Sequence, residues 1–389
     1  MGVTRVLLAA ALAAAVAVGA WALFLRPSDE GHPIWVGALE DAVKQPDPAT
    51  AEQRVALASQ AGLDTLGITT LWAQGQTQPD PTEVKLLRNV AAAAKRHRIR
   101  ILLSIFAGRP SFAPTTSAAR EQYARYLVLL ARDLPSIRAF AVWNEPNLNG
   151  FWLPQFDGSG KDIATSAYTA LLARSYDALK SVSPKILVYG GSLAPRGDDN
   201  PDAPRHTQSP TAFIRGMGRA YRASGRTKPI MDVLSMHPYL ERSALSPTTR
   251  HPLGTAIGIA DYEKLVDLLG EAFDGTTQPG RKLPIAYTEF GVQTMIPASA
   301  QEPYTNLQTP IGRDAVSEQT QAEYYRQALE LAACQPTAVG VLFFHLLDEP
   351  DLNRWQSGPY YADGTPKSSL GAIRKAAEQA RKGKVASCP

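Results

Sequence analysis

Residues 99–106 read IRILLSIF, and residues 139–142 read AFAV, two short apolar runs that fit buried strands. Between them, apolar side chains recur at spacings of three and four. They are Tyr123, Leu127, Leu130 and Leu134, which this period places on one face of a helix. A strand, a helix and a second strand in this order predict a parallel β-α-β unit.

The same alternation continues along the chain in both directions. Strands are predicted at residues 34–39, 65–70, 99–106, 139–142, 186–190, 233–236, 285–288 and 340–344. Helices are predicted at residues 51–61, 83–96, 118–134, 163–182, 212–223, 262–273, 318–334 and 370–380. Eight such units favour an α/β fold, the (β/α)8 TIM barrel. A doubly wound sheet is the rival, but residues 37–41 read GALED, not the Gly-rich phosphate loop that follows its first strand.

Composition excludes several classes of protein. The chain has 389 residues, of which 44% are hydrophobic and 20% charged, so disorder is not its main state. The formal net charge is +4 with no basic cluster, which argues against nucleic acid as a partner. Two cysteines are too few for a disulfide framework or a Cys-rich metal site. With no linker after residue 32, residues 27–389 are predicted to form one domain.

The first 26 residues predict export. Residues 6–25 contain no charged or strongly polar side chain and follow the positively charged Arg5. Their length exceeds that of a usual signal-peptide core and matches a membrane span of about 20 residues. A cleaved signal peptide and an uncleaved signal anchor at residues 6–25 therefore both stay open. Either way, the protein is predicted to be secreted or membrane-anchored, facing the cell exterior.

Export also changes the expectation for the two cysteines, which both lie late in the chain. An oxidising exterior permits a disulfide between Cys334 and Cys388, which would tie the C-terminal tail to the domain. Two unpaired thiols are the alternative, because the sequence does not supply the geometry that a disulfide needs.

Two glutamates stand where predicted strands meet their loops. Residues 141–147 read AVWNEPN, with Glu145, and residues 286–291 read AYTEFG, with Glu289. Strands four and seven lie on opposite sides of an eight-stranded ring, so their carboxyl ends face each other across its mouth. Retaining glycosidases need two carboxyl groups about 5 to 5.5 Å apart, one protonated and one ionised.

These two motifs, WNEPN at residues 143–147 and TEFG at residues 288–291, resemble clan A of the glycoside hydrolases, closest to family 39 and its relatives. The resemblance covers the whole barrel in strand order. It implies that Glu145 is the general acid/base, that Glu289 is the nucleophile and that Asn144 binds the 2-hydroxyl of the sugar.

The activity expected from this resemblance is that of a retaining O-glycoside hydrolase. It would act on an extracytoplasmic polysaccharide or glycoconjugate by double displacement. Two alternatives stay open: a catalytically silent glycan-binding surface protein, and a transglycosylase that uses the same two glutamates.

Five further residues are candidates for binding the carbohydrate substrate. His237 and Tyr239, in the run SMHPY, are similar to the clan pattern in which a His and a Tyr flank the nucleophile. Trp143 and Tyr287 precede the glutamates by two residues and are predicted to share their strand face and line the pocket floor, with barrel packing as the alternative. Trp355, in the loop after the eighth strand, suits stacking on a sugar face.

Two further observations from the sequence concern the substrate and the cofactor. Many clan members carry a Trp at the end of the eighth strand, whereas this chain reads FFHLLDE at residues 343–349, so the substrate of one family cannot be transferred. The sequence contains neither a His-Glu-x-x-His motif nor a cysteine cluster, and we expect no catalytic metal and no cofactor.

Overall fold

The computed structural model describes residues 31–308, 314–386 and 388. The predicted export segment, residues 1–26, and the anchor predicted within it at residues 6–25 lie outside the described residues. In the part of the chain that is described, none of the helices combines the length and apolar character that crossing a membrane requires.

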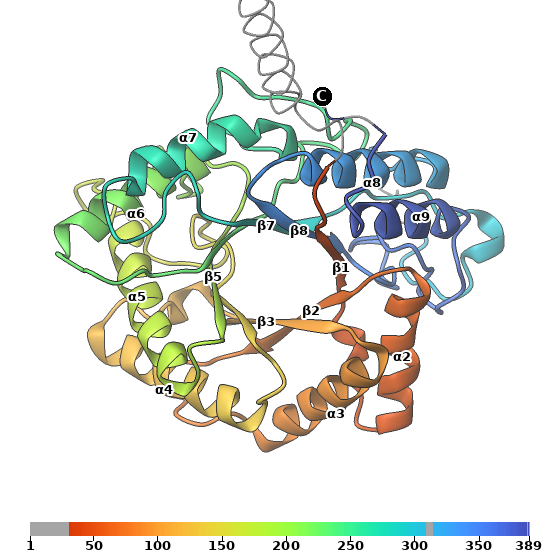
Figure 1. The fold of residues 1–389 in the computed structure, drawn as a ribbon, viewed down its shortest axis with the longest axis horizontal. Helices are drawn as coiled ribbons and strands as arrows, with labels where there is room; N and C mark the ends of the chain where they lie inside the picture. The colour runs from red at the N-terminus through yellow and green to blue at the C-terminus, as the bar shows by residue number, and fades with distance from the viewer. Residues whose placement is uncertain (1–30, 309–313, 387, 389) are drawn as a thin grey trace, which may run out of the picture.

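Among the described residues, eight parallel strands form a closed barrel, in which each strand pairs with the next along the chain and the last pairs with the first (Figure 1). They are β1 (Trp35–Leu39), β2 (Thr65–Leu71), β3 (Arg100–Phe106), β4 (Ala139–Val142), β5 (Leu187–Leu193), β6 (Val233–Met236), β7 (Ile285–Phe290) and β8 (Ala338–Phe344). The closed ring confirms the (β/α)8 TIM barrel and rules out the doubly wound sheet.

Eight helices of the described chain surround this ring (Figure 1). They are α2 (Pro48–Gln60), α3 (Pro81–His97), α4 (Ser117–Asp133), α5 (Ala164–Val182), α6 (Pro210–Ala223), α7 (Tyr262–Phe273), α8 (Glu318–Ala333) and α9 (Leu370–Ala380). Short 3-10 helices lie in loops that follow strands: η1 (Asp41–Val43), η2 (Pro110–Phe112), η3 (Ile259–Asp261) and η4 (Ala298–Ala300). The longer loops thus gather at the carboxyl ends of the strands, where barrel enzymes place their sites.

Local signals explain where the helices begin and end. Before α3, the Asp80 side chain accepts hydrogen bonds from the amides of Thr82 and Glu83, and Pro81 occupies the first turn. Arg98 ends the helix with a φ of 57°, and its amide bonds back to the last turn. Helix α4 buries the predicted apolar stripe completely, so its period predicted the face that packs on the barrel.

The core of the barrel has two layers. The larger cluster lies between strands and helices, and a smaller one fills the barrel interior. The smaller cluster consists of Leu39, Leu102, Ala141, Tyr189, Val233, Ala286 and Leu342. A fully buried leucine or valine of this kind contributes about 1.5 to 3 kcal/mol relative to its exposed state. The interior is tight at Gly67, where an added Cβ would lie 2.4 Å from Leu39.

The predicted disulfide is present. Cys334 follows α8, and Cys388 lies in the tail after α9, with 5.4 Å between their Cα atoms. The bond therefore joins the C-terminal tail to the end of α8, as predicted.

Candidate active site

Strand β4 ends at Val142, and the chain turns sharply after it. Trp143 and Glu145 have φ angles of 71° and 37°, in the left-handed region that non-glycine residues seldom adopt. The Glu145 amide donates to the carbonyl oxygen of Ser192, near the end of β5, at 2.9 Å. Because strand alternation stops here, Asn144 and Glu145 both line one cavity, which a regular strand would not allow.

Asn147 holds this turn against the loop after β5. Its side chain is buried, and its amide donates to the carbonyl oxygens of Ala194 at 3.2 Å and Gln208 at 2.9 Å. Its side-chain oxygen accepts from the Ala194 amide at 3.0 Å. Sequence reasoning quoted Asn147 within the motif but gave it no role; in the structure it fixes the loop that carries Glu145.

Glu145 and Glu289 meet at the mouth of the barrel. One oxygen of each carboxyl and Nδ1 of His237 all lie within 4.8 Å of one another. His237 Nδ1 is 3.0 Å from Glu145 Oε1 and 3.5 Å from Glu289 Oε2. The Tyr239 hydroxyl donates to Glu289 Oε2 at 3.1 Å. A close approach of two carboxyl groups is compatible with the retaining arrangement that the sequence predicts.

The environment raises the pKa of Glu289 and that of His237. Burial raises the pKa of Glu289 to about 7, and the charge of Glu145 adds to this rise. The charge of His237 and the hydrogen bond from Tyr239 both act to lower the pKa. Burial tends to lower the pKa of His237, but the charges of Glu289 and Glu145 outweigh it and the pKa rises. Burial and the nearby charge of Glu145 thus favour the protonated form of Glu289 in the unliganded site more than in water.

Two cavities meet at the pair. The inner lobe, of about 770 Å³, lies over the ends of β1, β2, β3 and β8. The outer lobe, of about 610 Å³, lies among the loops after β4 to β8. Both are lined by Glu145, Phe151, Glu289 and Phe344. Asn144 and His237 line the inner lobe alone, whereas Tyr239 and Trp355 line only the outer lobe.

Trp355, predicted to stack on sugar, forms part of an aromatic wall in the outer lobe. Its ring centroid lies 5.3 Å from that of Tyr239 and 5.5 Å from that of Phe344. Phe344, the last residue of β8, was not chosen from the sequence. The signal available in the sequence was its position at the end of the strand predicted at residues 340–344.

Trp143 and Tyr287 do not line either lobe, which corrects the prediction that they form the pocket floor. Both are buried in the layer between barrel and helices. Trp143 packs on Trp152 and donates from Nε1 to the carbonyl oxygen of Phe151, and Tyr287 donates to Gln335 at 2.6 Å. The alternation argument failed because β4 turns at Trp143 and the register of β7 shifts after Tyr287.

Glu40 is a site residue that sequence reasoning missed. It follows β1, is 6% exposed and lines the inner lobe. Its carboxylate accepts from the amides of Ala42 at 2.9 Å and Leu347 at 2.8 Å. Burial raises its pKa to about 7. The signal was the one that identified Glu145 and Glu289, a glutamate directly after an apolar strand.

The two glutamates also belong to the place where a metal ion could bind. Among the described residues, Glu145, His237 and Glu289 are the group of His, Cys, Asp and Glu side chains whose donor atoms lie close enough to ligate one ion. His237 Nδ1 lies within hydrogen-bond distance of Glu145 Oε1, and the Tyr239 hydroxyl donates to Glu289 Oε2, so both carboxyl groups have partners within the protein.

Comparison with known proteins finds similarity at the level of structure. No protein-family model and no curated protein matches the chain. An exo-β-1,4-mannosidase from Opitutaceae bacterium strain TAV5 is 17% identical with a TM-score of 0.55, over 91% of this chain and 63% of its own. The chain thus spans less than two thirds of that enzyme.

Two further structures carry glycoside hydrolase family labels. GH5_18 from Streptomyces cattleya is 16% identical with a TM-score of 0.59, over 92% of this chain and 83% of its own. A GH39 β-xylosidase from Caulobacter crescentus is 16% identical with a TM-score of 0.53, over 90% of this chain and 71% of its own. Families 5 and 39 are both represented, so the fold does not single out family 39. The chain has the (β/α)8 fold of these glycoside hydrolases.

Proposed function

We propose that this protein is a retaining O-glycoside hydrolase. One observation carries the proposal: two opposed carboxyl groups, with donor atoms within 4.8 Å, stand at the boundary between two lobes of one cleft. A glycan lying across both lobes would place a glycosidic bond between Glu145 and Glu289. A binding protein has no need of such a pair, whereas double displacement does.

The hydrogen bonds assign the roles of the two carboxyl groups. Tyr239 donates to Glu289 and stabilises its ionised form, which suits the nucleophile. Burial raises the pKa of Glu289 in the unliganded site, which opposes this assignment. We follow the hydrogen bond, because a substrate oxygen beside Glu145 would favour a proton on Glu145 over one on Glu289.

The reaction then proceeds in two steps. Glu289 attacks the anomeric carbon and forms an ester, while the bond to the leaving oxygen breaks and that oxygen takes the proton of Glu145. In the second step water enters the outer lobe and gives its proton to Glu145. The resulting hydroxide oxygen bonds to the anomeric carbon, the ester breaks, and Glu289 is released as a carboxylate. The configuration at the anomeric carbon is retained.

The two lobes supply the two sides of the substrate. Asn144, which the resemblance makes the ligand of the 2-hydroxyl, lines the inner lobe, so the inner lobe takes the sugar that is transferred. The outer lobe takes the leaving group. Residues 1–26 and the Cys334–Cys388 disulfide support action outside the cytoplasm on a polysaccharide or glycoconjugate.

Replacing the nucleophile tests the proposal. Glu289→Ala should lower turnover of 4-nitrophenyl glycosides by about 10⁴-fold or more while the protein stays folded, because covalent catalysis is lost. Added azide should restore release of nitrophenol and give a glycosyl azide of inverted configuration. Product NMR on the wild type should show the retained anomer first.

Specific outcomes would overturn the proposal. Wild-type turnover by the Glu289→Ala variant would exclude Glu289 as nucleophile. Glycan binding without turnover by the wild type would favour the silent binding protein. Products longer than the substrate, formed when acceptor sugars are present, would identify a transglycosylase instead.

A further inference from the structure

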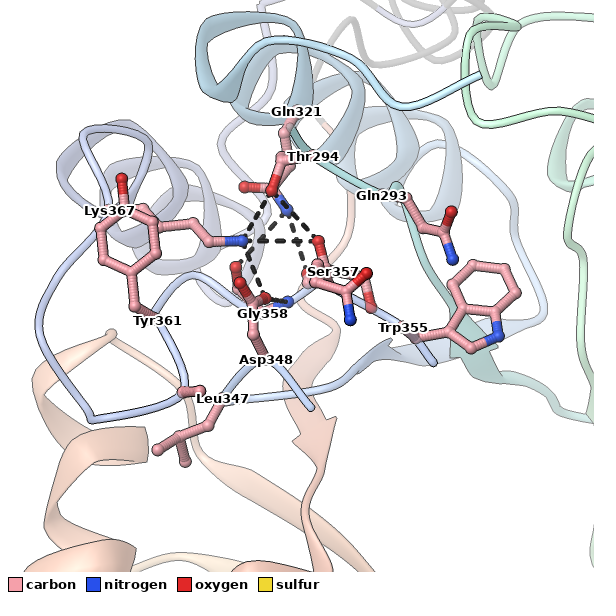
Figure 2. Close-up of polar contacts among 12 residues, drawn as sticks. Gln293, Thr294, Gln321, Leu347, Asp348, Trp355, Ser357, Gly358, Tyr361 and Lys367 are labelled. Carbon is pink, nitrogen blue, oxygen red and sulfur yellow. Dashed lines mark hydrogen bonds and ion pairs between the residues drawn. The ribbon is translucent and has the colours of Figure 1, made fainter. Parts of the chain in front are cut away.

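The loop after β8, residues 345–369, contains an ion pair with no exposure to solvent. Lys367 Nζ lies 2.8 Å from Asp348 Oδ1, and both side chains are 0% exposed (Figure 2). Removing two charges from water is costly, and their attraction offsets this cost only when further hydrogen bonds satisfy both groups. A pair buried this deeply is more effective at fixing a conformation than at adding stability.

The pair is satisfied by groups from two loops (Figure 2). Lys367 donates to the Thr294 hydroxyl, in the loop after β7, at 2.7 Å. Asp348 accepts from the Gly358 amide at 2.9 Å and from the Tyr304 hydroxyl, also after β7, at 2.7 Å. The pair and its hydrogen bonds therefore join the loop after β8 to the loop after β7 at a fully buried position.

Trp355 lies between Asp348 and Gly358, the two residues whose hydrogen bond joins the ends of this segment. The Trp355 amide donates to Glu349 Oε2 at 2.9 Å, and its carbonyl accepts from the Glu349 amide at 3.0 Å. The carbonyl of its neighbour Gln356 accepts from Lys367 at 3.4 Å and from the Thr294 amide at 3.0 Å. The backbone after Trp355 is thus held by Lys367 and its partner Thr294, and Trp355 itself is held by Glu349, the neighbour of Asp348.

Asp348, Glu349 and Arg354 of this segment line the inner lobe, whereas Trp355 lines the outer lobe. With Tyr239 and Phe344 it forms the aromatic wall of the outer lobe, beside Glu289. An aromatic ring presents a flat apolar surface to the C–H face of a pyranose. Such a wall would suit a sugar unit in the leaving group.

We propose that the Lys367–Asp348 pair positions Trp355 as a platform for a sugar unit on the leaving-group side of the cleft. The term leaving group rests on the proposed function; binding of a sugar at the wall does not. Lys367 lines neither lobe and is a positioning residue, acting on substrate through Trp355. Contacts remote from the reacting bond then favour oligosaccharides over substrates with small leaving groups.

Lys367→Met, Trp355→Ala and the double variant test this role. The substrates are 4-nitrophenyl β-mannoside, β-glucoside and β-xyloside, and the corresponding β-1,4-linked tetrasaccharides. Each single variant should lower kcat/KM for the tetrasaccharide about three- to tenfold more than for the aryl glycoside. The double variant should lose no more than the larger single loss, because both changes remove the same contact. Equal losses on both substrates, or additive losses, would overturn the proposal.

A matched control separates positioning from loss of stability. Arg226→Met breaks the Asp177–Arg226 ion pair, of 2.8 Å, which lies away from both lobes. It should lower the unfolding temperature and leave the ratio of kcat/KM between the two substrate types unchanged. A changed ratio in this control would show that the ratio reports stability and would remove the support for positioning.

A binding measurement distinguishes this inference from the proposed function. Calorimetric titration of Glu289→Ala with mannotetraose, cellotetraose and xylotetraose should detect binding that Lys367→Met weakens in the same background. If the wild type hydrolyses nothing while Lys367→Met still weakens binding, the proposed function fails and the inference stands. If none of the tetrasaccharides binds, or Lys367→Met leaves binding unchanged, the inference fails whatever the activity.

Discussion

Glu40 shows how a single buried carboxyl group makes stability depend on pH. Its pKa, raised by burial to about 7 in the folded protein, returns to about 4.5 when the chain unfolds. Below pH 4.5 the group is protonated in both states and contributes no pH dependence. As pH rises from 4.5 toward 7, only the unfolded state releases the proton. The free energy of unfolding therefore falls, by about 3 kcal/mol in total.

Glu40→Gln should remove this dependence. Urea unfolding between about pH 4.5 and 8 should show the unfolding free energy of the wild type falling relative to that of the variant as pH rises. The variant loses one acceptor for the Ala42 or Leu347 amide, which costs about 1 to 3 kcal/mol at every pH. Parallel curves for the two proteins would contradict the raised pKa.

Under the proposed mechanism, the pH dependence of activity belongs to Glu289. Attack requires ionised Glu289, whose pKa is raised to about 7, so kcat/KM should fall as the pH drops through this value. Tyr239→Phe removes a hydrogen bond that lowers this pKa and should shift the acidic limb to higher pH. The measurement is the pH profile of kcat/KM for both proteins on an aryl glycoside. An acidic limb near the ordinary pKa of 4.5 would contradict the assignment. An acidic limb that Tyr239→Phe leaves in place would also contradict it.

At the scale of elements, the sequence predicted where strands and helices lie better than how strands end. The bounds of β4, β6, α7 and α9 match the predicted ranges, because their apolar periods are clear. Strand β7 was expected to end at Thr288 but continues to Phe290, with a register shift on the way. Period alone reports neither this register shift nor the turn after β4, which is why the predicted positions of Tyr287 and Trp143 were wrong.

The candidate site likewise contains some residues that the sequence predicts and others that it does not. Glu145 and Glu289 could be predicted because a charged residue at the end of an apolar strand is a local signal. The Lys367–Asp348 pair and the Leu347–Glu40 hydrogen bond join residues 19 and 307 positions apart. Such contacts depend on how long loops fold over the closed barrel, and no periodicity in the sequence encodes that.

At the scale of the whole molecule, barrel closure brings the two ends of the described chain together. Strand β1 pairs with β8, and Glu40 and Leu347 then lie side by side in the inner lobe. Both halves of the chain therefore contribute to one cleft. The Cys334–Cys388 bond also acts at this scale, since it spans α9, which packs beside α8 and β1.

Removing the disulfide should lower stability while activity is retained. Its cysteines are 54 positions apart, and a cross-link of that length stabilises by about 2 to 4 kcal/mol, chiefly by restricting the unfolded chain. A Cys334→Ser, Cys388→Ser double variant should unfold at lower urea concentration. Its kcat/KM at about 25 °C should match the wild type, because neither cysteine lines a lobe. Dithiothreitol should bring the wild type down to the stability of the variant and leave the variant unchanged. Equal stability of the oxidised wild type and the variant would show that the bond does not stabilise the fold.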